Sequence, residues 1–127
     1  MESIEGYSKL EIYQLAHSIG VNIHQFSLKL PKHELYEIGN QLRRASKSIS
    51  ANIVEGYGRR RYKAEFMKFL VYALASCDET VEWLQYVKDC YAEHSTKADE
   101  FLNSTNELGK KINRFLQSVG SFHSSPK

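Results

Sequence analysis

Basic side chains gather in the middle of this sequence, around a pair of glycines. Arg59-Arg60-Arg61 and Lys63 follow the segment Gly56-Tyr57-Gly58, and Arg43 and Lys47 precede it. Guanidinium and ammonium groups near a helix start, together with exposed backbone N–H groups, can hold an anion. The phosphates of a nucleic-acid backbone would fit such a site without any reading of bases. The candidate phosphate contacts are Arg43, Lys47, Arg59, Arg60, Arg61 and Lys63.

Charge is unevenly distributed along the 127 residues. The formal net charge is only +2, but residues 41–68 contain eight basic and two acidic side chains, so this segment carries +6 and the remainder −4. A locally basic surface on a nearly neutral chain favours an acidic partner, of which nucleic acid is the commonest. Two alternatives stay open: a solvated surface, or arginines paired with acidic groups of a neighbouring subunit.

Other residues that could do chemistry give weaker signals. Tyr57 and Tyr62 flank the arginines and could stack on bases, although such tyrosines more often pack within a turn. His17 and His24 are separated by two helical turns, about 10 Å, which is too far for one metal ion without further ligands. No nucleophile–base set, catalytic carboxylate pair or nucleotide phosphate loop is evident. We therefore expect a non-enzymatic protein that needs no metal and no cofactor.

The composition is that of a globular domain with its own core. Hydrophobic residues make up 42% of the chain and charged residues 25%, and no apolar run approaches the roughly 20 residues of a membrane span. The acidic start of the chain lacks the features of a secretory signal. Cys77 and Cys90 would lie about 20 Å apart on one helix, too far for a disulfide between them. These features predict a cytoplasmic protein with reduced thiols and no membrane partner.

Apolar residues at alternating steps of three and four predict the helices that must position the basic residues. The first begins with a capping box at Ser8 and ends before Pro31, and the second ends at Gly56, where two glycines would adopt positive φ. The third spans residues 62–91 and the fourth residues 95–119. Short connections favour an all-α, antiparallel, up-down-up-down four-helix bundle over residues 8–120. Residues 1–7 then form an N-terminal extension and residues 121–127 a flexible C-terminal tail.

Three of the expected helices, the first, second and third, carry a second stripe in addition to the one that faces the core. On the first helix this weaker stripe comprises Leu10, Tyr13, His17, Val21, His24 and Leu28. Polar groups interspersed with aromatic rings on such a face are typical of a protein interface. The pattern predicts a homo-oligomer, and the alternative is a wide monomer core that reaches around the third helix. The candidate interface residues are Gln41, Arg44, Ser48, Asn52 and Glu55 on the second helix, and Tyr72, Ser76, Glu79, Trp83 and Tyr86 on the third.

The central stretch resembles the small bundle proteins encoded in intervening sequences of bacterial 23S ribosomal RNA genes. Residues 41–59 match the pattern Gln-Leu-Arg-Arg-Ala-x-x-Ser-Ile-x-x-Asn-Ile-x-Glu-Gly-x-Gly-Arg of that family. The resemblance extends over about residues 8–92, with Leu30-Pro31 and Glu34 matching the start of the second helix. Val54 stands where alanine is usual, and Ala75 replaces a frequent glycine.

The resemblance implies a four-helix bundle that assembles into a ring-like homopentamer. It also implies kinship with accessory proteins of diversity-generating retroelements, which bind reverse transcriptase and nucleic acid. Our hypothesis is a homo-oligomer that binds RNA or DNA through phosphate contacts. The alternative is an interaction scaffold, an accessory subunit for a polymerase or reverse transcriptase that does not itself bind nucleic acid.

Overall fold

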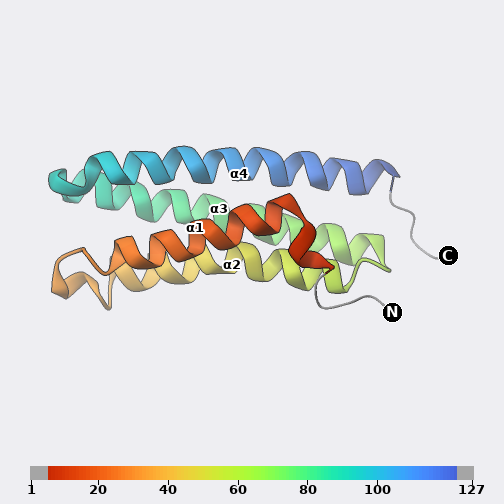
Figure 1. The fold of residues 1–127 in the computed structure, drawn as a ribbon, viewed down its shortest axis with the longest axis horizontal. Helices are drawn as coiled ribbons and strands as arrows, with labels where there is room; N and C mark the ends of the chain where they lie inside the picture. The colour runs from red at the N-terminus through yellow and green to blue at the C-terminus, as the bar shows by residue number, and fades with distance from the viewer. Residues whose placement is uncertain (1–5, 123–127) are drawn as a thin grey trace.

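The computed structural model describes residues 6–122 and consists of four long helices that run alternately up and down (Figure 1). α1 spans Glu11–Ser27, α2 Ile38–Gly58, α3 Lys63–Cys90 and α4 Ser95–Phe122. Three short 3-10 helices complete the fold: η1 (Tyr7–Lys9), η2 (Lys32–Glu34) and η3 (Ala92–His94). No strand occurs in this part of the chain. The predicted all-α, antiparallel four-helix fold is confirmed, and α4 continues to Phe122, into the segment predicted as a tail.

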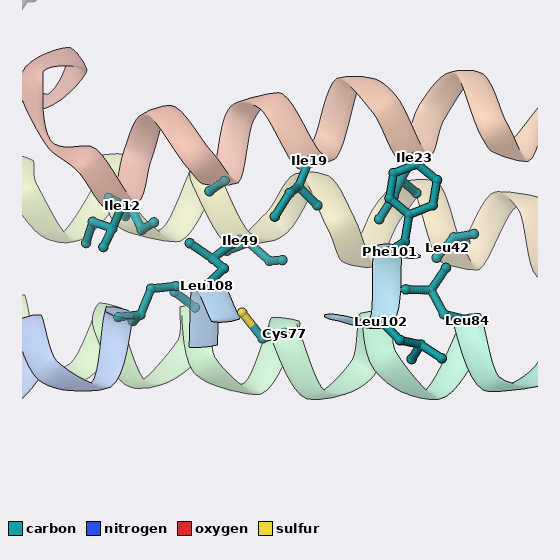
Figure 2. Close-up of a cluster of buried hydrophobic side chains, with 14 of the residues drawn as sticks. Ile12, Ile19, Ile23, Leu42, Ile49, Cys77, Leu84, Phe101, Leu102 and Leu108 are labelled. Atoms are coloured by element: carbon teal, nitrogen blue, oxygen red, sulfur yellow. The ribbon is translucent and has the colours of Figure 1, made fainter. Parts of the chain in front are cut away.

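The core lies along the axis of the bundle and receives one stripe from each helix (Figure 2). Ile23, Leu42, Leu84 and Ile112 have no exposed surface, and full burial of such a side chain contributes about 1.5–3 kcal/mol to stability. Cys77 belongs to the same core, where burial and the charge of Asp78 raise the pKa of its thiol to about 12. The core thiol therefore stays protonated and unreactive, as expected for a packing cysteine.

The start of α1 differs from the predicted capping box. The helix begins at Glu11, and Leu10, which has no side-chain acceptor, occupies the N-cap position. Residues Tyr7–Lys9 form η1 instead, and the Nε2 of Gln14 donates a hydrogen bond to the backbone oxygen of Ser8 at 2.9 Å. The extra 3-10 turn thus places Leu10, and not Ser8, at the N-cap position of α1.

Gly56 has a role different from the one predicted. Among residues 6–122 no glycine has positive φ, and α2 continues through both Gly56 and Gly58. A Cβ atom on Gly56 would lie 3.0 Å from the Cβ of Phe69 and 3.3 Å from the backbone oxygen of Phe66. The missing side chain thus allows α2 to approach the start of α3 closely. Nothing lies within 4 Å of a Cβ placed on Gly58.

These two glycines form a matched pair for mutation. Gly56→Ala should lower the free energy of unfolding by about 1–3 kcal/mol, because the added methyl group forces α2 and α3 apart. Gly58→Ala should leave it unchanged or raise it by at most about 1 kcal/mol, because alanine is the better helix former. Urea unfolding followed by circular dichroism measures both. Equal effects of the two substitutions would contradict the close approach at Gly56.

At the end of the bundle opposite Gly56, a buried carboxylate joins the connection between α1 and α2 to the connection between α3 and α4. Glu34 is 5% exposed, and its carboxylate accepts hydrogen bonds from the Tyr91 hydroxyl and from the backbone N–H of Ile38 at 3.2 Å. The second bond holds the start of α2. The first links η2 to the end of α3, since Tyr91 follows the last residue of that helix. Glu34 therefore fixes where α2 begins and in which direction it runs.

This link predicts a pH dependence of stability. The hydrogen bond to the Glu34 carboxylate, with smaller effects of desolvation and nearby charge, raises the pKa of Tyr91 from 10 to about 12. The pKa of Tyr91 is therefore higher in the folded state than in the unfolded state. As a result, its hydrogen bond to Glu34 contributes fully to the free energy of unfolding below pH 10, and this contribution is lost as pH rises through about 12. The stability difference between the wild type and Tyr91→Phe should therefore be constant from pH 7 to pH 9 and shrink by pH 11.5. Urea titrations at these pH values measure it, and a difference that grows with pH would contradict the link.

Candidate nucleic-acid interface

The antiparallel topology brings the end of α2, the start of α3, the end of α4 and the segment before α1 to one end of the bundle, on the right in Figure 1. We call this the basic end and define it as residues 6–14, 52–69 and 107–122. It contains nine basic and four acidic side chains, whereas the other described residues contain seven basic and nine acidic ones. The nine basic residues are Lys9, Arg59, Arg60, Arg61, Lys63, Lys68, Lys110, Lys111 and Arg114.

Arg59 is the most strongly engaged of the predicted phosphate contacts. Its Nε lies 3.3 Å from Oε2 of Glu55 and its Nη1 lies 3.2 Å from Oε1 of Glu65. Glu65 also pairs with Lys68 at 3.1 Å, and the Arg59 guanidinium lies 4.9 Å from the ring centre of Phe69. All four charged side chains are more than a third exposed, so solvent screens these pairs and a phosphate can compete with them.

The next two arginines differ in their surroundings. Arg60 is half-buried: its Nη1 donates to the backbone oxygen of Tyr57 at 2.8 Å, and its guanidinium covers the Tyr57 ring at 4.0 Å. Tyr57 therefore packs within the turn and does not offer a free face to a base. Arg61 is exposed, and so is Tyr62, whose ring centre lies 5.9 Å from the Arg61 guanidinium. Of the two predicted stacking tyrosines, Tyr62 is the more exposed.

Basic residues of α4, which were not among the predicted phosphate contacts, complete this surface. The Nζ of Lys111 lies 3.6 Å from Oε1 of Glu11 on α1, and Arg114 is exposed. Both line a shallow groove of about 280 Å³ between α4 and the start of α1. They are about 50 residues from Arg61 in sequence, so sequence position alone does not indicate that they lie at the same end of the bundle. The only available signal was the antiparallel order, because it puts the ends of the second and fourth helices together.

Two of the predicted phosphate contacts lie away from the basic end. Arg43 is half-buried, and its guanidinium donates to Ser27 Oγ at 3.0 Å and to the backbone oxygen of Leu35 at 2.7 Å. It thus ties the end of α1 to the connection that follows. Lys47 faces α1 instead, with its Nζ 2.9 Å from Nδ1 of His24, and it lies about 18 Å from Arg59 along α2. The structure therefore divides the six predicted residues into two separate places.

The predicted interface stripes lie side by side on the outside of the α2–α3 pair. Ser48 Oγ donates to Ser76 Oγ at 2.7 Å, and the Asn52 amide donates to the backbone oxygen of Ser48 at 2.9 Å. Trp83 is half-buried and packs against the core, as the alternative of a wide core predicts for that residue. The aromatic groups left open are Tyr72, 46% exposed, and Tyr86, 48% exposed. Gln41, Arg44, Glu55 and Glu79 are also exposed.

Residues 6–122 contain no group of three or more histidine, cysteine, aspartate or glutamate side chains that could hold a metal ion. Within the same range, none of the helices combines the length and the apolar character needed to cross a membrane. What the basic end offers chemically is a set of charged hydrogen-bond donors, partly balanced by carboxylates, around one exposed tyrosine. Charged donors of this kind suit the oxygen atoms of an oxyanion.

Comparison with known proteins gives two matches of different kinds. Residues 8–114 match the family model described as 23S rRNA-intervening sequence protein. Among solved structures, the chain is similar to the crystal structure of a protein with unknown function from the S23 ribosomal protein family from Bacteroides thetaiotaomicron. The TM-score is 0.75 at 20% identity, over 84% of this chain and 95% of that chain, which shows a shared fold. The comparison with curated proteins found no match.

Proposed function

Because this chain belongs to the family of 23S rRNA-intervening sequence proteins, we propose that it is a non-enzymatic, homo-oligomeric protein that binds RNA or DNA through phosphate contacts. The observation that carries this proposal is the gathering of nine basic side chains from separate segments at one end of the bundle. Phosphates attract such a surface whatever the base sequence, so binding is governed by charge and not by base recognition.

The exposed groups suit a flexible strand. Arg61 and Arg114 come from different segments and are both exposed, so they can hold separate phosphates of one strand. Tyr62, 54% exposed, lies beside Arg61 and offers a ring on which one base can stack. Arg59 joins them by exchanging its carboxylate partners for a phosphate. Arg60 and Lys63 lie in the same turn and add positive potential.

Self-association is supported by the outer face of α2 and α3. Tyr72 and Tyr86 lie on the same stripe of α3, nearly half exposed, among polar groups of both helices. Burial of these rings against a second copy would remove apolar surface from water, and the neighbouring polar groups would set the register. Of the possible assemblies, a ring-like homopentamer is the one that we propose, in keeping with the sequence resemblance.

A salt titration tests nucleic-acid binding. Filter binding of a 20-nucleotide single-stranded RNA should show affinity that falls about 50-fold between 50 and 200 mM salt, as expected for about four phosphate contacts. RNAs of unrelated sequence should bind within a few-fold of each other. Absence of RNA and DNA binding at low salt would overturn the proposal. Salt-sensitive retention of a protein partner by the same surface, without nucleic acid, would then favour the scaffold alternative.

A further inference from the structure

The second stripe of α1 borders a groove that the proposed function does not use. The groove lies between α1 and α2, has a volume of about 460 Å³, and is lined by His17, Gly20, Val21, His24, Gln25, Lys47 and Ser50. Its volume is within the usual range for small-molecule sites. It is separated from the basic end, since Lys47 lies about 18 Å from Arg59 along α2.

Basic and neutral polar groups line this groove. The titratable groups that face it are His17 and His24 on α1 and Lys47 on α2, and none of its lining residues carries a carboxylate. Arg43, one helical turn before Lys47 on α2, keeps its positive charge but does not line the groove; its guanidinium donates to Ser27 Oγ and to the backbone oxygen of Leu35. Hydroxyl and amide groups of Ser50 and Gln25 lie in the same lining. All these groups can donate hydrogen bonds to an oxyanion.

The contact between Lys47 and His24 depends on protonation. The Nζ of Lys47 lies 2.9 Å from Nδ1 of His24. An ammonium group only donates, so Nδ1 must accept, and the imidazole is neutral in this arrangement. Uptake of a proton by the imidazole would place two positive charges in contact. An oxyanion bound between them would accept from both and remove the repulsion.

We propose that this groove is a pH-dependent site for a small oxyanion, the phosphate or carboxylate group of a compact metabolite. Lys47 and His24 hold the oxyanion. His17, two helical turns before His24 on α1, adds charge to the same groove, and its ring stacks on that of Tyr13 with the ring centres 5.7 Å apart. Val21, 44% exposed, offers an apolar surface in the same groove on which a short apolar body can lie. A bound oxyanion favours the protonated form of the imidazoles beside it, so affinity rises as pH falls.

Sulfate, inorganic phosphate and acetate are the probes for this site. Sulfate and acetate keep their charge between pH 6 and pH 8, so any change in their affinity reports on the protein. Titration at constant ionic strength, followed by the imidazole carbon–proton NMR signals, should show saturable shifts of His17 and His24, with at least fivefold tighter sulfate binding at pH 6 than at pH 8. Preference for sulfate and phosphate over acetate would identify a phosphate ligand, and the reverse preference a carboxylate ligand.

Variants separate the site from general charge effects. Lys47→Met should weaken sulfate binding about tenfold, the usual effect of losing one charged hydrogen bond. Lys29→Met removes the same charge from a position outside the groove and should change binding less than twofold. Arg61→Glu, at the basic end, should also leave it unchanged. The proposal is overturned by shifts that do not saturate, by affinity that is equal at the two pH values, or by equal losses in Lys47→Met and Lys29→Met.

Discussion

Replacement of both Arg61 and Arg114 by glutamate is expected to weaken binding of single-stranded RNA about 100-fold at 100 mM salt. Each substitution removes one phosphate contact and adds a repulsive charge, worth about 1.4 kcal/mol per site, or tenfold. The slope of log affinity against log salt should fall in magnitude by about 1.4, because each contact with a single strand contributes about 0.7. Filter binding over a salt series measures both quantities.

The control for this experiment carries the same change in net charge at the other end of the bundle. Lys29 and Lys97 are exposed and belong to the part of the chain that is acidic overall, so Lys29→Glu with Lys97→Glu should weaken binding only a few-fold. Equal losses in the two double variants would mean that net charge alone governs binding. Since Arg61 and Arg114 are exposed, the melting temperature of their variant should stay within a few degrees of the wild type.

Replacement of Tyr72 and Tyr86 by glutamate is expected to convert the proposed oligomer into monomers. Light scattering should then give a mass near 14.7 kDa, in place of a multiple of that value. Two charges placed in a closed interface without partners cost several kcal/mol. Because both rings are nearly half exposed in the protomer, the helical circular-dichroism signal should be kept.

Tyr36 provides the matched control, since it is 82% exposed and lies outside the two stripes. Tyr36→Glu should leave the mass unchanged. Trp83→Glu changes the same face, but Trp83 also packs against the core. Loss of helicity in that variant would mean that Trp83 stabilises the fold of the single protomer. A wild-type mass near 14.7 kDa at micromolar concentration would contradict self-association itself.

The two predictions are connected through symmetry. In a cyclic ring whose axis runs along the bundles, every protomer presents its basic end on the same face. Several basic ends could then hold one strand, and the effective concentration of the second contact would raise the overall affinity. The dissociated Tyr72 and Tyr86 variant should therefore bind a long RNA less tightly than the wild type, and bind a very short one about equally.

Several details of the fold were not predictable because they depend on distant neighbours. Gly56 follows the last apolar residues of a helix, which in sequence is typical of a helix end, but it is glycine because α3 passes close to it. Arg43 stands in a basic run, yet its guanidinium is bound by Ser27 and Leu35 on the preceding segments. In each case the local pattern is compatible with two roles, and a contact across the bundle selects one.

What the sequence by itself determined was the set of helices and the residues that face the core. The spacing of apolar residues such as Ile23, Leu42 and Leu84 is a local property of a helix with 3.6 residues per turn, so it can be read without knowing the neighbours. Only the tertiary structure decided which charges belong together. It brought Arg114 to the same end of the bundle as Arg61 and kept Lys47 away from that end, because hydrogen-bond partners and the distances between helices follow from packing and not from position in the chain.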